Sequence, residues 1–405
     1  MKLNNIIFGS LFFASSLIAS DFSTSFNYFG NLTGSTLNKD GFNTKGYQID
    51  DVENHFRLSS YSKLGLQSTI YNDNFMFVAQ VVAHYEEDNI RANLTWFNAK
   101  YNINSDFNIR IGRIQSSLFF NSDSRDIDYL HPWALEPSAF HGLMPMRYYE
   151  GIEFTYNKVI GDYYININLT PYATVETDID DLVENSILTA KDTFLISFTI
   201  SNNNFKFKTS YIKSTVDIPI YDNDYHTVIS ILEAQGNNMD SYNYTNKKVS
   251  FLSAGLEYMY KNYYFITEIA KRESDSLLSD TLVYYSLLSY KYNDFTPFIM
   301  YACNDNEASY YDTTLINDPL TGGMAKIELE KILYSTNDSQ KTISLGFRYD
   351  FKVGVVFKAQ IDKTTIKDYG IDHSDTTKRL GFIERDAMID DDSVYQAIIG
   401  LSFAF

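Results

Sequence analysis

The chain has 405 residues and a formal net charge of −18, so we expect no nucleic-acid partner. Its single cysteine, Cys303, excludes an intrachain disulfide framework, and no zinc-binding spacing links it to the six histidines. No window after residue 20 approaches the roughly 18 consecutive apolar residues of a transmembrane helix. This excludes a membrane protein built from a bundle of helices.

The first 20 residues are typical of a secretory signal peptide. Lys2 supplies a short positive region, and residues 6–18 form an apolar segment that is too short to span a membrane. We expect cleavage after Ala19 or Ser20. The exported protein would then be residues 21–405, which we predict to form one domain.

Apolar and polar residues alternate repeatedly along the rest of the chain. Residues 107–114 (FNIRIGRI), 163–172 (YYININLTPY), 343–351 (ISLGFRYDF) and 395–405 (YQAIIGLSFAF) show the pattern. A period of two is the signature of a β-strand with one apolar and one polar face. Arg110 falls on the polar face, so we expect it to point into water while the apolar face meets lipid.

The connections between these strands alternate between short and long. Short polar turns are predicted at about 72–74, 104–106, 158–162, 202–204, 261–262, 293–294 and 351–352. Longer loops are predicted at about 35–55, 87–91, 115–147, 173–191, 216–248, 273–280, 304–339 and 365–392. Seven short turns and eight loops give sixteen strands with every long loop at one end.

Such an asymmetry is typical of outer-membrane barrels, and closure leaves no unpaired strand edge in lipid. We therefore predict an all-β protein, a closed antiparallel transmembrane β-barrel of about sixteen strands in a Gram-negative outer membrane. Eighteen strands would result if residues 225–233, inside loop 216–248, supplied additional ones.

Three of the loops, 173–191, 304–339 and 365–392, carry most of the negative charge. On the outside of the cell their carboxylates could loosely bind divalent cations that bridge anionic lipid headgroups. They could equally form a solvated, repulsive rim. We expect no other cofactor and no metal site.

Loop 115–147 differs from the others because it carries many large apolar side chains. These are Leu118, Phe119, Phe120, Leu130, Trp133, Leu135, Phe140, Leu143 and Met144. An exposed loop would not need them, so we predict that this third long loop folds into the lumen and packs on the inner wall. Its acids are Asp123, Asp126, Asp128 and Glu136.

In this region the sequence resembles the trimeric general porins of Gram-negative outer membranes. The resemblance covers residues 61–157 best. It is carried by KLGLQ at 63–67, RIGRI at 110–114, HPW at 131–133 followed by EPSAFHG, and EGIEFTY at 150–156, together with the terminal Phe405.

The resemblance implies that the third loop narrows the channel, with its acids facing basic residues of the wall. Lys63 and Arg113 match basic wall positions of the family, Arg147 is nearest to a third, and Arg110 adds a further lumenal charge. Phe405 matches the terminal aromatic residue that the barrel-assembly machinery reads.

These features predict a porin for passive diffusion of ions and small hydrophilic solutes, not an enzyme. We expect a homotrimer in contact with outer-membrane lipid and lipopolysaccharide. A substrate-selective channel of eighteen strands and a structural or adhesin barrel are the alternatives. An outer-membrane enzyme would need a nucleophile and base, and an autotransporter would need a passenger before Phe22; neither is indicated.

Overall fold

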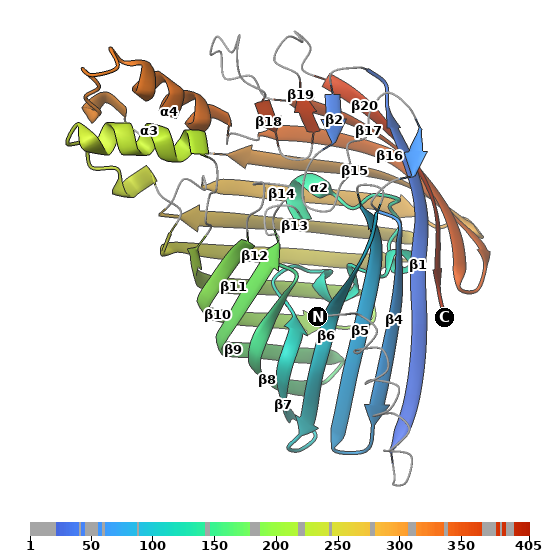
Figure 1. The fold of residues 1–405 in the computed structure, drawn as a ribbon. Helices are drawn as coiled ribbons and strands as arrows, with labels where there is room; N and C mark the ends of the chain where they lie inside the picture. The colour runs from blue at the N-terminus through green and yellow to red at the C-terminus, as the bar shows by residue number, and fades with distance from the viewer. Residues whose placement is uncertain are drawn as a thin grey trace.

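The computed structural model describes residues 22–39, 42–44, 56–58, 61–86, 89–141, 146–178, 187–217, 223–242, 245–275, 280–306, 313–335, 339–366, 378–380, 383–385 and 393–405. The predicted signal peptide lies outside this part of the chain. Long strands pair antiparallel with their neighbours in the chain, and the last strand pairs with the first (Figure 1). The sheet therefore closes on itself.

Sixteen strands of the described chain form this barrel, which confirms the predicted number. They are β1 (Ser23–Leu37), β4 (Lys63–Tyr71), β5 (Phe75–Glu86), β6 (Asn89–Asn102), β7 (Phe107–Gln115), β8 (Tyr148–Ile160), β9 (Tyr163–Asp178), β10 (Ile187–Ser201), β11 (Phe205–Asp217), β12 (Lys247–Tyr260), β13 (Tyr263–Ser274), β14 (Thr281–Tyr290), β15 (Phe295–Asn306), β16 (Gln340–Lys352), β17 (Val355–Ile366) and β20 (Ser393–Ala404).

The remaining elements lie in the connections. The short β3 (Arg57–Leu58) pairs with β1, while β2 (Phe42–Thr44), β18 (Lys378–Leu380) and β19 (Ile383–Arg385) form a small sheet that joins the first and last long loops. The helical elements are η1 (Ser122–Ser124), η2 (Asp128–Leu130), α2 (Ser138–His141), α3 (Asn223–Ala234), η3 (Asp240–Tyr242), η4 (Thr313–Leu315) and α4 (Met324–Ser335). None of the helices in the described residues has the length and apolar character to cross a membrane.

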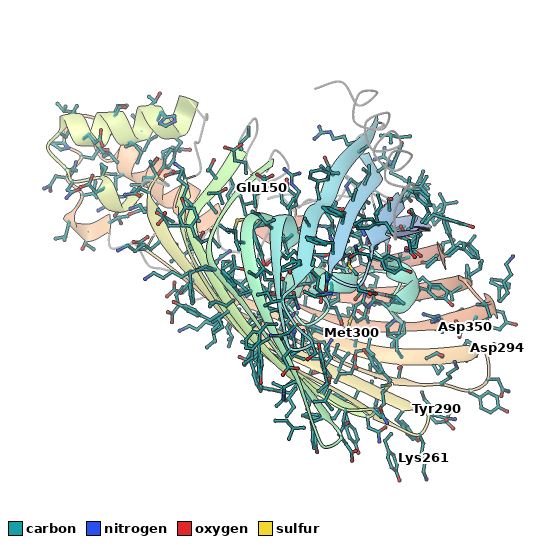
Figure 2. All side chains as sticks on the ribbon, turned by 90° about the horizontal axis from the view of Figure 1, so that it is seen from below. Glu150, Lys261, Tyr290, Asp294, Met300 and Asp350 are labelled. Atoms are coloured by element: carbon teal, nitrogen blue, oxygen red, sulfur yellow. The ribbon has the colours of Figure 1, made fainter. Side chains whose placement is uncertain are left out.

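Asparagine side chains shape three of the short turns. In each, the carboxamide oxygen of Asn72, Asn104 or Asn202 accepts hydrogen bonds of 2.7–3.0 Å from the backbone N–H groups two and three residues later. The side chain thereby replaces a backbone acceptor and fixes a tight reversal. Figure 2 shows the turn residues Lys261, Asp294 and their neighbours at the end of the barrel opposite α3 and α4.

The two faces of the wall differ in chemistry, as the alternation predicts. On β20, Ile399 and Leu401 are exposed, whereas the alternate residues Ile398 and Ser402 on either side of them are buried. Exposed apolar residues recur on every side of the barrel, and water would not support so large an apolar surface. The outer face is therefore the lipid-facing one, and the polar face lines the lumen.

Residues 225–233 form part of helix α3, so the eighteen-strand alternative is wrong. Tyr225, Val228 and Leu232 recur at helical spacing and pack with residues of the loop that contains α4, among them Ile316 and Leu329. This spacing buries one helical face in a small core beyond the barrel (Figure 1). Strand β9 also extends to Asp178 and β10 starts at Ile187, which shortens the predicted loop 173–191.

The terminal residue completes the seam at which the barrel closes. The Phe405 backbone N–H donates to the Tyr28 carbonyl at 2.8 Å, and the Tyr28 N–H donates to the Phe405 carbonyl at 2.9 Å. The Phe405 ring centroid lies 5.3 Å from that of Tyr28 and 6.2 Å from that of Phe403. The residue thus joins the first and last strands.

We predict that Phe405→Asp lowers the folded fraction in outer-membrane fractions several-fold, because it places a charge on the lipid-facing seam and removes both ring contacts. Heat-modifiable electrophoretic mobility measures the folded fraction, and Phe405→Tyr is the matched control. Normal refolding of Phe405→Asp in detergent would assign the loss in cells to recognition during assembly. Equal folded yields of Phe405→Asp and the unaltered protein in cells would contradict the prediction.

Candidate constriction site

The third long loop, between β7 and β8, lies inside the barrel as predicted. Its buried apolar residues are Leu118, Phe119, Phe120, Trp133, Phe140 and Met146, and they join one core with inward-facing residues of strands β7 to β15. Leu135 is buried against Ile398 of β20. Leu130 is instead exposed, and Leu143 and Met144 lie outside the described residues.

Aromatic rings supply much of this contact. Phe140 packs on Tyr285 of β14 at a centroid distance of 5.0 Å and on Phe119 at 5.1 Å. His131 stacks on Trp133 at 4.8 Å, and the Trp133 ring meets Tyr285 edge-on. Tilted and edge-on aromatic pairs add about 0.5–1.5 kcal/mol each beyond their burial. The loop is consequently packed like a protein core.

Inward-facing side chains of the wall also bind the backbone of the loop. The carboxamide oxygen of Gln360 on β17 accepts from the N–H groups of Ala134 at 3.0 Å and Leu135 at 3.1 Å, and its nitrogen donates to the Leu135 carbonyl at 3.2 Å. On the other side, Glu268 of β13 accepts from the Phe120 N–H at 2.7 Å.

Basic side chains of the wall donate to loop carbonyl groups in the same way. Lys208 of β11 donates to the Phe119 carbonyl at 2.6 Å, and Lys63 of β4 donates to the Arg125 carbonyl at 3.4 Å. Lys358 of β17 donates to the carbonyl of Asp128, and Arg348 of β16 to that of Tyr129. Lys358 and Lys208 are almost completely buried. These charges fix the loop and do not line open water.

Three of the four predicted loop acids form ion pairs. Lys63 lies 3.1 Å from Asp128, Arg147 lies 2.9 Å from Asp126, and Arg125 lies 2.5 Å from Glu136. Lys63 and Arg147 therefore face acids of the third loop. All six side chains are less than 20% exposed.

Burial and charge act oppositely on these carboxyl groups. Burial alone would raise the pKa of Asp126, but Arg147 and Lys63 hold it below its ordinary value; Arg125 likewise overcomes burial and lowers the pKa of Glu136. For Asp128 burial prevails over Lys63 and raises the pKa. Burial lowers the pKa of His131 to about 4, so the ring that stacks on Trp133 is neutral at pH 7.

Asp123 is the exposed member of the loop acids. It interacts electrostatically with Lys208 of β11 and with Glu153 of β8, so it faces the wall formed by strands β8 to β11. Next to this part of the wall, Arg110 of β7 lies 3.4 Å from Glu153. Lys100 of β6 is the register partner of Arg110. The Arg110 side chain is 33% exposed. Partly hydrated charges of both signs therefore meet here.

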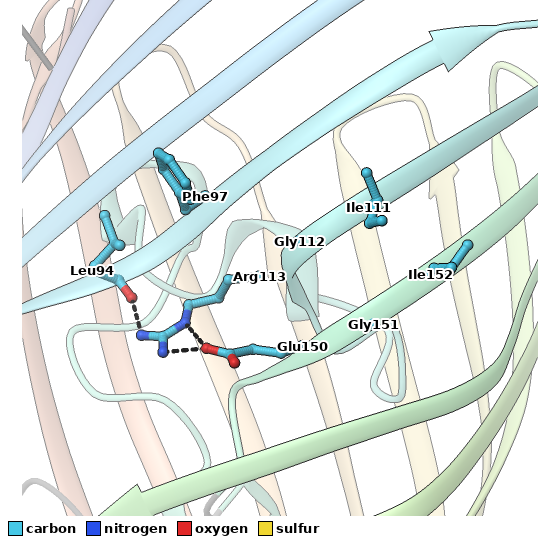
Figure 3. A pocket seen from close by; sticks show the side chains of 8 residues that line it. All are labelled: Leu94, Phe97, Ile111, Gly112, Arg113, Glu150, Gly151 and Ile152. Atoms are coloured by element: carbon cyan, nitrogen blue, oxygen red, sulfur yellow. Dashed lines mark hydrogen bonds and ion pairs between the residues drawn. The ribbon is translucent and has the colours of Figure 1, made fainter.

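Arg113 lies on the outer face, which corrects its predicted place at the constriction. It stands opposite Phe97 of β6, which is 61% exposed, and opposite Glu150 of β8. Its guanidinium binds the Glu150 carboxylate and donates to the Leu94 carbonyl at 2.8 Å (Figure 3).

Arg113 faces outward because successive side chains of a strand alternate between its two faces. Arg110 and Arg113 are three residues apart, so a strand sends them to opposite faces. Ile114, the next residue, faces inward and is only 1% exposed because the third loop covers it. Before Gly112, which has a φ of +125°, the outward residues of β7 are apolar and the inward ones polar. Beyond it the outward residue is the charged Arg113 and the inward one the apolar Ile114.

A groove of about 390 Å³ marks this part of the outer wall (Figure 3). Its lining consists of Leu94, Phe97, Ile111, Gly112, Arg113, Glu150, Gly151 and Ile152. Gly112 of β7 and Gly151 of β8 are register partners, so the lining of the groove has two adjacent positions without side chains.

The wall residues that hold the loop could not be identified from the sequence. Gln360, Lys358, Arg348 and Glu268 occupy inward positions of their strands, as do many polar residues of other strands. Their contacts with the loop reach across as many as 230 residues of sequence. The alternation gives their side of the wall but not their partner.

No protein-family model matches this sequence, and no curated protein matches it. The structure is similar to the outer-membrane channel DcaP of Acinetobacter baumannii (TM-score 0.54, 7% identity, 95% of this chain and 98% of that one) and to Salmonella typhi OmpF in complex with daunomycin (0.52, 11%, 95% and 98%). It is also similar to the trimer form of OmpT, an outer-membrane protein of Vibrio cholerae (0.52, 9%, 95% and 100%).

At these identities the similarity shows the fold, which is that of outer-membrane porins and channels. A closed barrel with an apolar outer face satisfies its backbone within lipid, and barrels of this kind with short turns at one end span bacterial outer membranes. The chain is accordingly an outer-membrane protein of the Gram-negative type.

We predict that Gln360→Leu loosens the third loop. The change leaves the buried N–H groups of Ala134 and Leu135 without their acceptor, which should weaken the hold on the loop by about 2 kcal/mol. Open-channel current noise in planar bilayers should rise. Gln396→Leu is the matched control, since the buried Gln396 amide nitrogen has no hydrogen-bond partner among the described residues. If the current noise of Gln360→Leu equalled that of the unaltered protein, the hydrogen bonds of Gln360 would not be what holds the loop.

Proposed function

We propose that the protein is a passive channel for ions and small hydrophilic solutes. The observation that carries this proposal is a closed barrel whose third loop is fixed to the inner wall while Asp123 on the loop and Arg110 on the wall keep hydrated charge. The buried carboxylates of the site are engaged with basic side chains or loop backbone, which suits a structural role and not catalysis.

The charges around the constriction favour weak ion selectivity. Three loop acids are paired with basic side chains, so no single sign dominates the lumen. A field between the exposed Asp123 and the partly exposed Arg110 would order water and favour polar solutes. The acidic outer loops add a mild preference for cations. Because the Debye length is about 8–10 Å at physiological salt, this preference should weaken as salt rises.

We predict that Asp123→Lys reduces the permeability of cations relative to anions several-fold. The change removes the exposed negative charge of the loop and adds a positive one near Glu153, the partner of Arg110. The reversal potential of the purified protein in planar bilayers under a salt gradient measures it.

Arg113→Gln is the matched control and should leave selectivity unchanged, since Arg113 lies outside the lumen. Selectivity that responds to Arg113 but not to Asp123 would overturn the assignment of the constriction. A folded, unaltered protein that passes no ions would overturn the proposed function itself.

We also infer that the protein is a homotrimer whose subunits meet at the outer face of β6 to β8. Arg113 lies six residues beyond Phe107, whose ring belongs to the aromatic girdle at the short-turn end. At 3.3 Å per residue and a tilt near 45° it lies about 14 Å into the apolar band. A charged pair at this depth is costly in lipid, and a protein neighbour would shield it. The OmpT structure similar to this one is described as a trimer.

Replacing Arg113 and Glu150 together by leucine should shift trimers toward monomers, because the variant surface suits lipid as well as protein. Light scattering coupled to size exclusion in mild detergent measures the oligomer. The control replaces Lys271 and Glu273, an exposed pair 2.7 Å apart on β13, by leucine. A monomeric unaltered protein, or equal trimer loss in both variants, would contradict this interface.

A further inference from the structure

A row of neutral polar side chains crosses the inner wall on β8 and β9. Thr155 and Asn157 of β8 stand opposite Asn168 and Asn166 of β9, and Tyr164 follows on the same face. These positions are inward because the alternate positions of β8, such as Phe154 just before Thr155, are exposed to the lipid side. We refer to Thr155, Asn157, Tyr164, Asn166 and Asn168 as the amide row.

The members of the amide row are joined by a chain of hydrogen bonds. Thr155 Oγ1 donates to Asn168 Oδ1, Asn168 Nδ2 donates to Asn166 Oδ1, and Asn166 Nδ2 donates to Asn157 Oδ1, each at 2.9 Å. The Tyr164 hydroxyl also donates to Asn157 Oδ1. These bonds hold the carboxamides in fixed orientations before any solute arrives.

The fixed carboxamides retain hydrogen-bonding capacity. A carboxamide has two donor hydrogens and an oxygen with two lone pairs. In the bonds of the described residues, Asn157 uses only its oxygen, and Asn166 uses one hydrogen and one lone pair. The Asn166 amide nitrogen also lies within hydrogen-bonding reach of the Tyr164 hydroxyl. Asn157 can therefore still donate to a solute, and Asn166 can still accept.

The amide row lies on the path from the constriction to the short-turn end. Its first member, Thr155, is two residues from Glu153, which pairs with Arg110 and interacts electrostatically with the exposed Asp123 of the loop. Its last member, Tyr164, is 42% exposed and follows the turn that contains Gly161. A solute that passes the constriction on this side would meet the row next.

We propose that the amide row is a weak binding site for neutral polyhydroxylated solutes, such as short oligosaccharides. Fixed neutral groups that both donate and accept match the hydroxyl groups of a sugar, and the exposed Tyr164 ring offers an apolar face to a sugar ring. An ion gains less, because the row carries no charge and Arg110 already faces a carboxylate. The inference rests on the proposed channel function and names a solute class for it.

The test is block of ion current by maltotriose in planar bilayers, with the sugar added at the short-turn side. The unaltered protein should show block that saturates at millimolar sugar. Asn157→Leu combined with Asn166→Leu should raise the half-blocking concentration at least five-fold at unchanged ion conductance. Asn102→Leu is the matched control, since Asn102 faces the lumen at the same end on β6 and lies outside the row.

Heat-modifiable mobility confirms that each variant is folded, and the single variants replace the double one if it does not fold. Ion conductance without block beyond the viscosity effect of the sugar would overturn the amide row and leave the channel standing. Equal block in the double variant, or stronger block by gluconate than by maltotriose, would also overturn it. A protein without ion conductance would overturn the channel, and this inference with it.

Discussion

Every other feature of the structure depends on the inability of lipid to form hydrogen bonds with a peptide backbone. An open sheet edge within the bilayer would cost several kcal/mol for each unpaired group. The pairing of β20 with β1, completed by Phe405 and Tyr28, removes that edge. Once the sheet is closed, each strand has one face in lipid and one in the lumen, so the lumenal face must hold all the polar chemistry.

Closure also directs apolar side chains into the lumen, where the third loop covers them. Apolar inward residues such as Ile266 and Leu287 would face water in an empty barrel, and the aromatic residues of the loop cover them. The loop in turn brings buried backbone groups, which need partners inside the wall. Gln360, Glu268 and Lys358 provide these partners. The division of the lumen into a covered apolar side and a polar side with the amide row follows from this packing.

Much of the fold could be predicted from local pattern because a barrel strand is a local object. A period of two, asparagine turns and an apolar third loop were enough to predict sixteen strands and an occupied lumen. The predictions that were wrong are those that departed from the spacing of the residues themselves. In residues 225–233 the spacing of Tyr225, Val228 and Leu232 is that of a helix and not of additional strands. In residues 107–114 the two arginines are three positions apart and therefore lie on opposite faces of β7, not on one.

The sequence by itself determined that the chain closes into a barrel and that loop 115–147 enters it, because burial of apolar residues and backbone pairing are dictated by nearby residues. Only the tertiary structure decided which charges remain hydrated. Lys63 is paired with Asp128 and Arg147 with Asp126, whereas Asp123 and Arg110 keep contact with water. The physical reason is that these ion pairs, and the hydrogen bonds from wall side chains to the loop backbone, form between strands and loops far apart in the chain. The alternation of a strand specifies the face on which a side chain lies without specifying its partner.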